Sequence, residues 1–278
     1  MKGIRNILFI VLTVLMAISC TKESQESFVE VTLDYSVRTD AHTRAFGEGD
    51  SVTHIWYALY RENGTFVRSF LPAQMRDGVA CCPVTVVIDQ PYKVVFVGMN
   101  CSQTSDRMIP AYNVDEENAL LIMPTVSSAN SEKLDCFYGI DDLLVGARGT
   151  TAEITLDRIT SQVNFLCTLD SPNADYVSEA SATSRMTLYG VAESFNLLEG
   201  TFSEEVVDVT YEESALLVGS DIMHGEKYRL CSVYTFAGED VSVEFSLNVE
   251  GVDQPVISAS TAHLPLAPNK RTNIIVNN

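Results

Sequence analysis

The sequence lacks the short motifs that mark the common catalytic sites, and it is poor in histidine. Its four histidines are isolated from one another, and no pair stands in the His-Glu-x-x-His arrangement that binds zinc. There is no Gly-x-Ser-x-Gly elbow to expose a nucleophilic serine, and no glycine-rich loop to bind phosphates. We therefore expect a protein that is not an enzyme and that binds no cofactor and no metal.

Basic residues are also scarce, because 18 Lys and Arg stand against 37 Asp and Glu, which gives a formal net charge of −19. A chain this acidic repels nucleic-acid phosphates, so nucleic acid is not an expected partner. The acidic residues are scattered or form short clusters such as 115–117 and 141–142, without the spacing of an EF-hand loop. We interpret the charge as a means of solubility outside the cell; calcium at one of the acidic pairs is the alternative.

The sequence has an apolar run over residues 7–18, which is too short to span a bilayer comfortably. Lys2 and Arg5 precede this run, and a small residue, Cys20 and a polar stretch follow it. That order is typical of an export signal. A small residue followed by cysteine resembles a bacterial lipoprotein signal, which implies removal of residues 1–19 and lipidation of Cys20. The lipid would attach the precursor to the outer membrane.

Residues 28–37 alternate strictly between apolar and polar side chains. The apolar face consists of Val29, Val31, Leu33, Tyr35 and Val37. Period-two alternation over this length predicts a half-buried β-strand. The polar segment that follows the strand is of the kind that proteases cut. One interpretation is a first strand and an ordinary loop. The other is cleavage after Arg44, which would make Ala45 the new N-terminus and free the strand.

Strand-like runs recur along the rest of the chain and are separated by turn signals such as Asn63-Gly64 and Glu250-Gly251. The runs cover residues 52–60, 84–89, 92–99, 152–156, 163–169, 186–192, 228–236, 241–249 and 272–276. Short strands rich in β-branched residues favour an all-β fold of sandwiches. Residues 114–121 are the main candidate for helix. The aromatic residues at 56, 57 and 60 are interpreted as core, with a sugar-binding patch as the alternative.

We place a domain boundary just before the 152–156 run. The predicted order is a signal peptide (1–19), a propeptide that holds the first strand (20–44), an N-terminal β-sandwich (45–148) and a C-terminal β-sandwich (149–278). The mature chain is long enough for two ordinary domains.

Six cysteines remain if Cys20 is lipidated. They are Cys81, Cys82, Cys101, Cys136, Cys167 and Cys231. An even number in an exported chain permits disulfides. Cys167 and Cys231, however, lie inside strand-like runs, where a free cysteine behaves as a small buried hydrophobe. We expect mostly reduced core cysteines and leave their pairing open.

Four segments of the chain form an ordered set of landmarks. They are Arg44-Ala45-Phe46-Gly47-Glu48-Gly49-Asp50, the run 52–60 with its Asn63-Gly64 turn, residues 156–165, and Pro265-Leu266-Ala267-Pro268-Asn269-Lys270-Arg271-Thr272-Asn273-Ile274. Their order resembles that of the fimbrillins, the subunits of type V pili in Bacteroides-like bacteria. The resemblance implies two transthyretin-like β-sandwich domains in tandem.

The resemblance also implies a function. Fimbrillins are exported as lipoprotein precursors and assemble by protease-triggered donor-strand exchange, so other fimbrial subunits are the expected partners. For this chain, cleavage at Arg44 would release the strand that carries Val31 and Leu33, and a neighbour's strand would fill the groove. The expected location is the cell surface, first as an outer membrane lipoprotein and then in the fimbrium, with a role in cell adhesion.

The chain departs from the fimbrillin pattern near its C-terminus. Polymerising fimbrillins continue into extra donor strands, whereas this sequence ends shortly after the 272–276 run. We therefore expect a tip or minor subunit. The alternative, which applies if Arg44 is not cut, is a cell-surface lipoprotein that does not polymerise and binds a glycan or a host protein.

Overall fold

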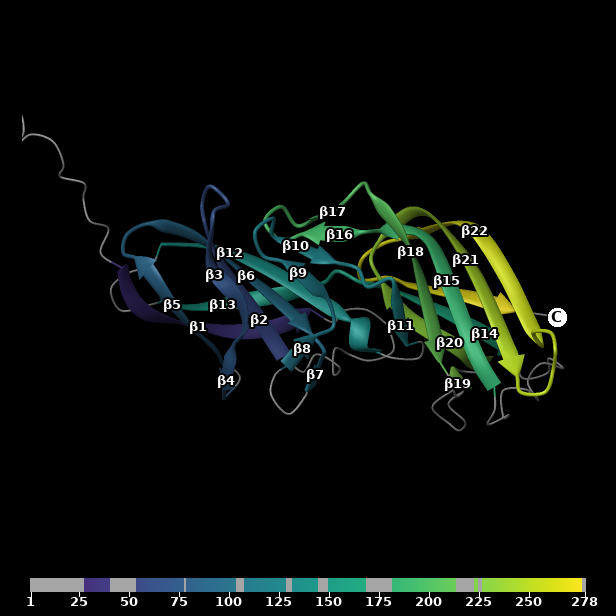
Figure 1. Ribbon diagram of the computed structural model, residues 1–278. Coiled ribbons are helices and arrows are strands. Elements are labelled where there is room, and N and C mark those ends of the chain that lie inside the picture. The colour runs from purple at the N-terminus through teal and green to yellow at the C-terminus, as the bar shows by residue number, and fades with distance from the viewer. Residues whose placement is uncertain are drawn as a thin grey trace, which may run out of the picture.

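The computed structural model describes residues 28–40, 54–77, 79–103, 108–128, 132–144, 150–168, 182–213, 223–224 and 227–276. Over these residues the fold is all-β, which confirms the predicted class, and it adds one short 3-10 turn, η1 (Glu132–Leu134). The strands form five sheets along an elongated molecule, with the N-terminal sheet at one end and the C-terminal sheets at the other (Figure 1). No described segment forms a helix that could span a bilayer.

The N-terminal half is built on one eight-stranded sheet with the order β3-β2-β6-β12-β13-β1-β5-β4. Its strands are β1 (Phe28–Asp40), β2 (His54–Arg61), β3 (Phe66–Pro72), β4 (Gln74–Arg76), β5 (Val79–Val87), β6 (Pro91–Met99), β12 (Cys136–Leu144) and β13 (Thr150–Arg158). The sheet curls, as a hydrogen bond between two of its distant strands shows. Tyr57 Oη of β2 donates this bond to the Pro83 carbonyl of β5 at 2.9 Å. Strands that are distant in the sheet order therefore face each other.

The curled sheet encloses a cluster of buried apolar side chains that we call the N-terminal core. Its members are Val31, Leu33, Tyr35, Ile55, Tyr57, Leu59, Ala80, Cys82, Val84, Val86, Tyr92, Val94, Phe96, Phe137, Leu143, Ile154 and Leu156. Strands β1, β2, β5, β6, β12 and β13 all contribute to it. One sheet thus supplies both walls of this core.

Two sheets face each other in the C-terminal half. The first has the order β11 (Val126–Ser128), β18 (Val206–Glu213), β15 (Ala182–Ala192), β21 (Gly238–Val249) and β22 (Ile257–Leu266), and the second β19 (Met223–His224), β20 (Lys227–Thr235), β14 (Ser161–Thr168) and β23 (Arg271–Val276). Phe165 of β14 stacks on Phe245 of β21 with ring centroids 4.6 Å apart. This contact lies between the two sheets.

A third, smaller sheet and a hairpin complete the described fold. They consist of β9 (Asn113–Asp115), β10 (Leu120–Ile122), β16 (Ser194–Asn196) and β17 (Thr201–Phe202), and of β7 (Cys101–Gln103) with β8 (Met108–Pro110). The small sheet borders both halves. Tyr138 Oη of β12 donates a hydrogen bond to the carbonyl of Leu197, the residue after β16, at 2.7 Å, and the ring centroid of Phe202 on β17 lies 5.5 Å from that of Phe236, which follows β20.

A second buried cluster, the main core, runs through both halves of the molecule. Its aromatic members are Trp56, Tyr60, Phe70, Tyr112, Phe165, Phe195, Tyr211, Tyr234, Phe236 and Phe245. Strand β2 contributes to both cores, with Tyr57 in the N-terminal core and Trp56 in the main core. Trp56 is only 6% exposed and stacks on Phe70, so the interpretation of this aromatic run as core is confirmed and a sugar-binding patch there is excluded.

Within the described residues each of the nine predicted runs corresponds to a strand, whereas the predicted helix does not form. Residues 114–121 form β9, a tight turn and β10 instead of a helix. Asp115 accepts hydrogen bonds from the backbone and side-chain nitrogens of Asn118, and Ala119 takes a left-handed φ of 54°, which closes the turn. The run 152–156 lies beyond the predicted boundary at 148/149. In the structure it belongs to β13, which pairs with β1 and β12 in the N-terminal sheet.

None of the six described cysteines forms a disulfide, as the sequence favours. Cys82, Cys136, Cys167 and Cys231 are buried, whereas Cys81 and Cys101 are half-buried. The packed cores of this fold therefore contain no cross-link among the described cysteines.

Candidate functional site

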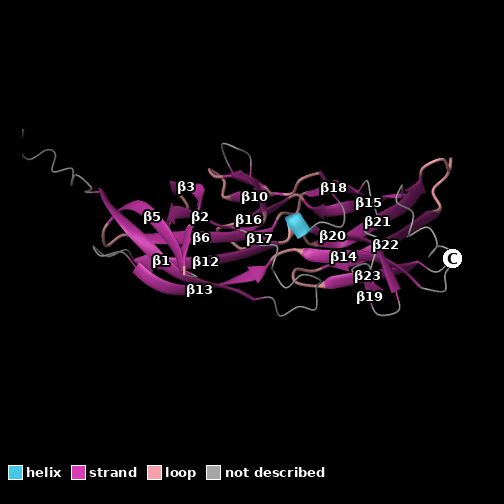
Figure 2. Ribbon diagram, turned by 90° about the horizontal axis from the view of Figure 1, so that it is seen from below, coloured by secondary structure: helices cyan, strands magenta, loops and turns pink. Residues whose placement is uncertain are grey.

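The first strand of the chain lies in the interior of the eight-stranded sheet. β1 pairs antiparallel with β5 over residues 28–36 and parallel with β13 over residues 33–40. Figure 2 shows β1 between these two strands. On its other side β5 pairs only with β4. Removal of β1 would therefore leave the β4–β5 pair without strand pairing to the rest of the sheet, and the pair would be held only by its chain connections to β3 and β6 and by contacts with β2.

The alternation of β1 places its apolar face in the N-terminal core. Leu33 and Tyr35 are completely buried and Val31 is 9% exposed, whereas Val29 and Val37 are half-buried. Full burial of an apolar side chain is worth roughly 1.5–3 kcal/mol, so the first three side chains contribute on the order of 5–9 kcal/mol. A whole domain is typically stable by only about 5–15 kcal/mol. The N-terminal core therefore depends on this strand.

Tyr35 occupies a socket between two small residues. Its register partners are Ala80 on β5 and Ala152 on β13, and its ring centroid lies 4.7 Å from that of Phe96. Its Oη donates a hydrogen bond to Asp141 Oδ2 at 2.7 Å. Burial raises the pKa of Tyr35 well above its usual value, and the hydrogen bond to Asp141 raises it further. Tyr35 therefore remains a protonated donor at any physiological pH.

Asp141 is a carboxylate on the inward-facing side of β12. Phe137 and Leu143, which share its alternation, are both in the N-terminal core. Its neighbour Asp142 faces the other way and forms an ion pair with Lys93 at 3.0 Å. Sequence reasoning treats 141–142 as one surface cluster and misses this difference. The signal that distinguishes them is the period-two spacing of residues 137, 139, 141 and 143.

Cys82 lies beside β1, on the neighbouring strand β5. Cys82 is the register partner of Leu33 on β5 and is completely buried. Burial raises the pKa of Cys82 to about 12, and electrostatic interactions with Cys81 and Asp34 raise it further. A buried, protonated thiol is a poor nucleophile. Its reactivity is therefore expected to report whether β1 is in place.

The other predicted site residues lie outside the described part of the chain. Cys20, the predicted lipidation site, precedes the first described residue. Arg44 and Ala45, the predicted cleavage site, fall in the segment between β1 and β2, which is also outside the described residues. The structure thus describes the strand but neither of the two sites at which we expect processing.

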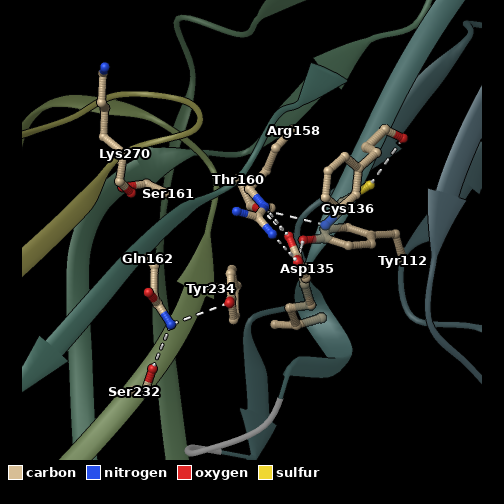
Figure 3. A network of polar contacts seen from close by, with 12 residues as sticks. Tyr112, Asp135, Cys136, Arg158, Thr160, Ser161, Gln162, Ser232, Tyr234 and Lys270 are labelled. Carbon is tan, nitrogen blue, oxygen red and sulfur yellow. Dashed lines mark hydrogen bonds and ion pairs between the residues drawn. The ribbon is translucent and has the colours of Figure 1, made fainter. Parts of the chain in front are cut away.

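A buried ion pair joins the two halves close to where the chain passes between them (Figure 3). Arg158, the last residue of β13, donates two hydrogen bonds of 2.9 Å to the two carboxylate oxygens of Asp135. Both side chains are about 1% exposed. Thr160 donates a third hydrogen bond to Asp135, and the Arg158 guanidinium lies 5.9 Å from the ring centroid of Tyr234 on β20. The pair contacts both halves and is buried among their side chains.

A cleft of about 820 Å³ opens in the C-terminal half. Its walls combine apolar side chains with carboxylates, including Phe202, Val206, Pro265, Leu266, Glu204, Glu239 and Asp240. The strand pairs β15–β18 and β21–β22 shift register here, and Gly190 takes a φ of +84°. A Cβ on Gly238 would lie 2.8 Å from the Gly190 carbonyl oxygen, so the two glycines allow the backbones to approach.

Comparison with known proteins gives structural neighbours among the solved structures. No model of a known protein family matches the sequence. No curated protein matches it significantly.

Among solved structures, a candidate polysaccharide-binding protein from Bacteroides thetaiotaomicron has a TM-score of 0.52 at 10% identity, over 89% of this chain and 91% of that one. A candidate cell adhesion protein from Bacteroides eggerthii has a TM-score of 0.49 at 11% identity, over 90% and 86%. A fimbrial assembly protein from Parabacteroides distasonis has a TM-score of 0.45 at 10% identity, over 91% and 93%. At 10% identity, the similarity to the first of these three proteins shows a shared fold and nothing more.

Proposed function

We propose that the protein is a fimbrial subunit that is exported as a lipoprotein precursor and assembled by donor-strand exchange. The observation that carries this proposal is the position of β1, an interior strand of its sheet that is joined to the rest of the chain only through the segment that contains Arg44. The order of the fimbrillin-like sequence landmarks supports the same function.

The proposal includes a division into two transthyretin-like sandwiches. The first would be the curled sheet of residues 28–158, and the second would be the two facing sheets that begin with β14. The division would fall after Arg158, later than the boundary that the sequence suggests, because β13 pairs with β1 over residues 33–40. The small sheet of β9, β10, β16 and β17 would lie between the two units.

Cleavage after Arg44 would convert β1 from a part of the chain into a separate bound peptide. Loss of that peptide exposes the facing edges of β5 and β13 together with the apolar floor of the N-terminal core, and a strand from another subunit restores both. The C-terminal strands β22 and β23 are themselves paired within their sheets. We therefore propose that the described part of this chain accepts a strand, as a tip or minor subunit would.

Treatment of the purified precursor with an Arg-specific protease tests the proposal. We expect a stable product that begins at Ala45, and we expect it to take up a fluorescent peptide with the sequence of residues 28–40. Cys82 should become reactive toward alkylating reagents once the β1 fragment is removed, while Cys231 in the main core stays protected. Peptide mapping by mass spectrometry reads both thiols.

The matched control is Arg44→Lys, which keeps the positive charge but removes the cleavage site. This variant should retain β1, keep Cys82 protected and take up no peptide. A cut wild-type protein that holds its β1 fragment and excludes the added peptide would overturn strand exchange.

The cleft in the C-terminal half favours a second function, that of a surface lipoprotein that binds a ligand without polymerising. The cleft has an apolar wall that includes Phe202 and Val206, and one solved structure with the same fold is described as a candidate polysaccharide-binding protein. A glycan array separates the two functions. Binding that is lost in Val206→Asp, together with mature protein that starts at a lipidated Cys20, would favour this alternative.

A further inference from the structure

The socket that holds Tyr35 is shaped for one large side chain. Ala80 on one neighbouring strand and Ala152 on the other are its register partners, so both flanks carry only a methyl group at this level of the sheet. The opposite wall of the curled sheet supplies Phe96, whose ring is tilted by 58° against that of Tyr35. A small side chain at the Tyr35 position would leave a void between these groups.

The far end of the same socket carries a carboxylate. Asp141 faces the N-terminal core from β12, and the hydrogen bond that the structure gives it comes from Tyr35. When β1 leaves, the carboxylate loses this donor and faces the open groove. Asp141 is half-buried when β1 is in place, so a strand that enters without a donor at this level would remove part of the water around the carboxylate and return no hydrogen bond, which is costly for a charged group.

We propose that Asp141 selects the strand that replaces β1, by requiring a tyrosine at the level of Tyr35. The inference rests on the proposed function. It defines the chemistry of the partner as an extended segment with two aliphatic residues at two-residue spacing, followed two residues later by tyrosine, as in Val31, Leu33 and Tyr35. The aliphatic residues fill the groove, and the tyrosine sets the register, because a shift by one residue would turn every side chain to the wrong face.

Phenylalanine is the informative competitor for this position. It fills the aromatic part of the socket next to Phe96 but has no hydroxyl group for Asp141. A hydrogen bond to a charged partner is worth enough that its loss should weaken binding roughly 10- to 100-fold. A strand that differs only by this hydroxyl group therefore isolates the contribution of the carboxylate.

Peptide competition on the full-length protein, cut with an Arg-specific protease, tests the selection. Two labelled peptides with the sequence of residues 28–40 are compared, one native and one with Tyr35→Phe. On the wild-type protein we expect the native peptide to bind at least about 10-fold more tightly. Equal binding of the two peptides would overturn the role of Asp141, and this comparison needs no variant protein.

Two protein variants locate the effect. In Asp141→Leu the preference for tyrosine should disappear or reverse, because the carboxylate is gone. In Asp142→Leu, which changes the outward-facing neighbour on the same strand, the preference should remain. A preference that survives Asp141→Leu would assign selectivity to another group. If neither peptide enters the cut wild-type protein, the proposed function itself fails, and that outcome differs from the uptake of both peptides without selectivity.

Discussion

The two cores of the molecule differ in how they depend on the first strand. The N-terminal core is enclosed by one curled sheet and takes Val31, Leu33 and Tyr35 from β1. The main core is enclosed by several sheets, and none of its buried members comes from β1. Loss of β1 should therefore open the first core and leave the second intact. The difference between the two cores indicates that one chain can combine a replaceable strand, β1, with a main core that does not depend on that strand.

The contacts between the cores explain how the scaffold could hold the open half in place. Strand β2 gives Tyr57 to one core and Trp56 to the other, so the wall between them is shared. Tyr138 and the Asp135–Arg158 pair join the N-terminal sheet to the C-terminal half. None of these contacts involves β1. The five strands of the N-terminal sheet from β3 to β13 in its order would keep their pairing if β1 left.

The largest loss of stability is expected from placing charges on the buried face of β1. Val31→Asp combined with Leu33→Asp buries two carboxylates in the N-terminal core, which should cost more than about 5 kcal/mol and prevent accumulation of folded precursor. Soluble yield and thermal unfolding measure the loss. Thr32→Asp changes the exposed face of the same strand and should have little effect. Normal folding of the double variant would show that β1 is dispensable, contrary to the comparison of the cores.

Sequence patterns predict those parts of the site that depend on neighbouring residues alone. The buried face of β1 follows from alternation, because one face of the strand packs on a core and the other is solvated. The strand at 54–61 does not alternate, since both its faces are buried. The pairing of β1 with β5 and β13 joins residues that are distant in sequence, and no local pattern reveals it. The same is true of the partnership between Tyr35 and Asp141.

A second, smaller effect is expected at the junction between the halves. Asp135→Ala leaves the Arg158 guanidinium buried without its partner, which should destabilise the protein by about 3–5 kcal/mol. Because the pair contacts both halves, we expect the thermal transition to split into two. Differential scanning calorimetry would detect the split.

The double variant Asp135→Leu with Arg158→Leu serves as the control for this prediction. It removes both charges together and replaces them with apolar side chains, so it should lose much less stability than Asp135→Ala. A double variant that is as unstable as the single one would mean that shape, and not the unpaired charge, decides the stability of the junction.

The smallest effect is expected from a single methyl group at the edge of the N-terminal core. A Cβ on Gly139 of β12 would lie 2.8 Å from Leu156 Cδ2 and 3.0 Å from the Thr155 carbonyl oxygen on β13. The backbone oxygen cannot move without shifting β13, the strand on which β1 pairs. Gly139→Ala should therefore cost about 1–3 kcal/mol.

Gly238→Ala creates a similar contact in the C-terminal half, where a Cβ would lie 2.8 Å from the Gly190 carbonyl oxygen. If the two cores are separate in the way described, only Gly139→Ala should raise the alkylation rate of Cys82, because only that substitution loosens the sheet that holds β1. Equal rates in both variants would show that strain passes freely between the cores.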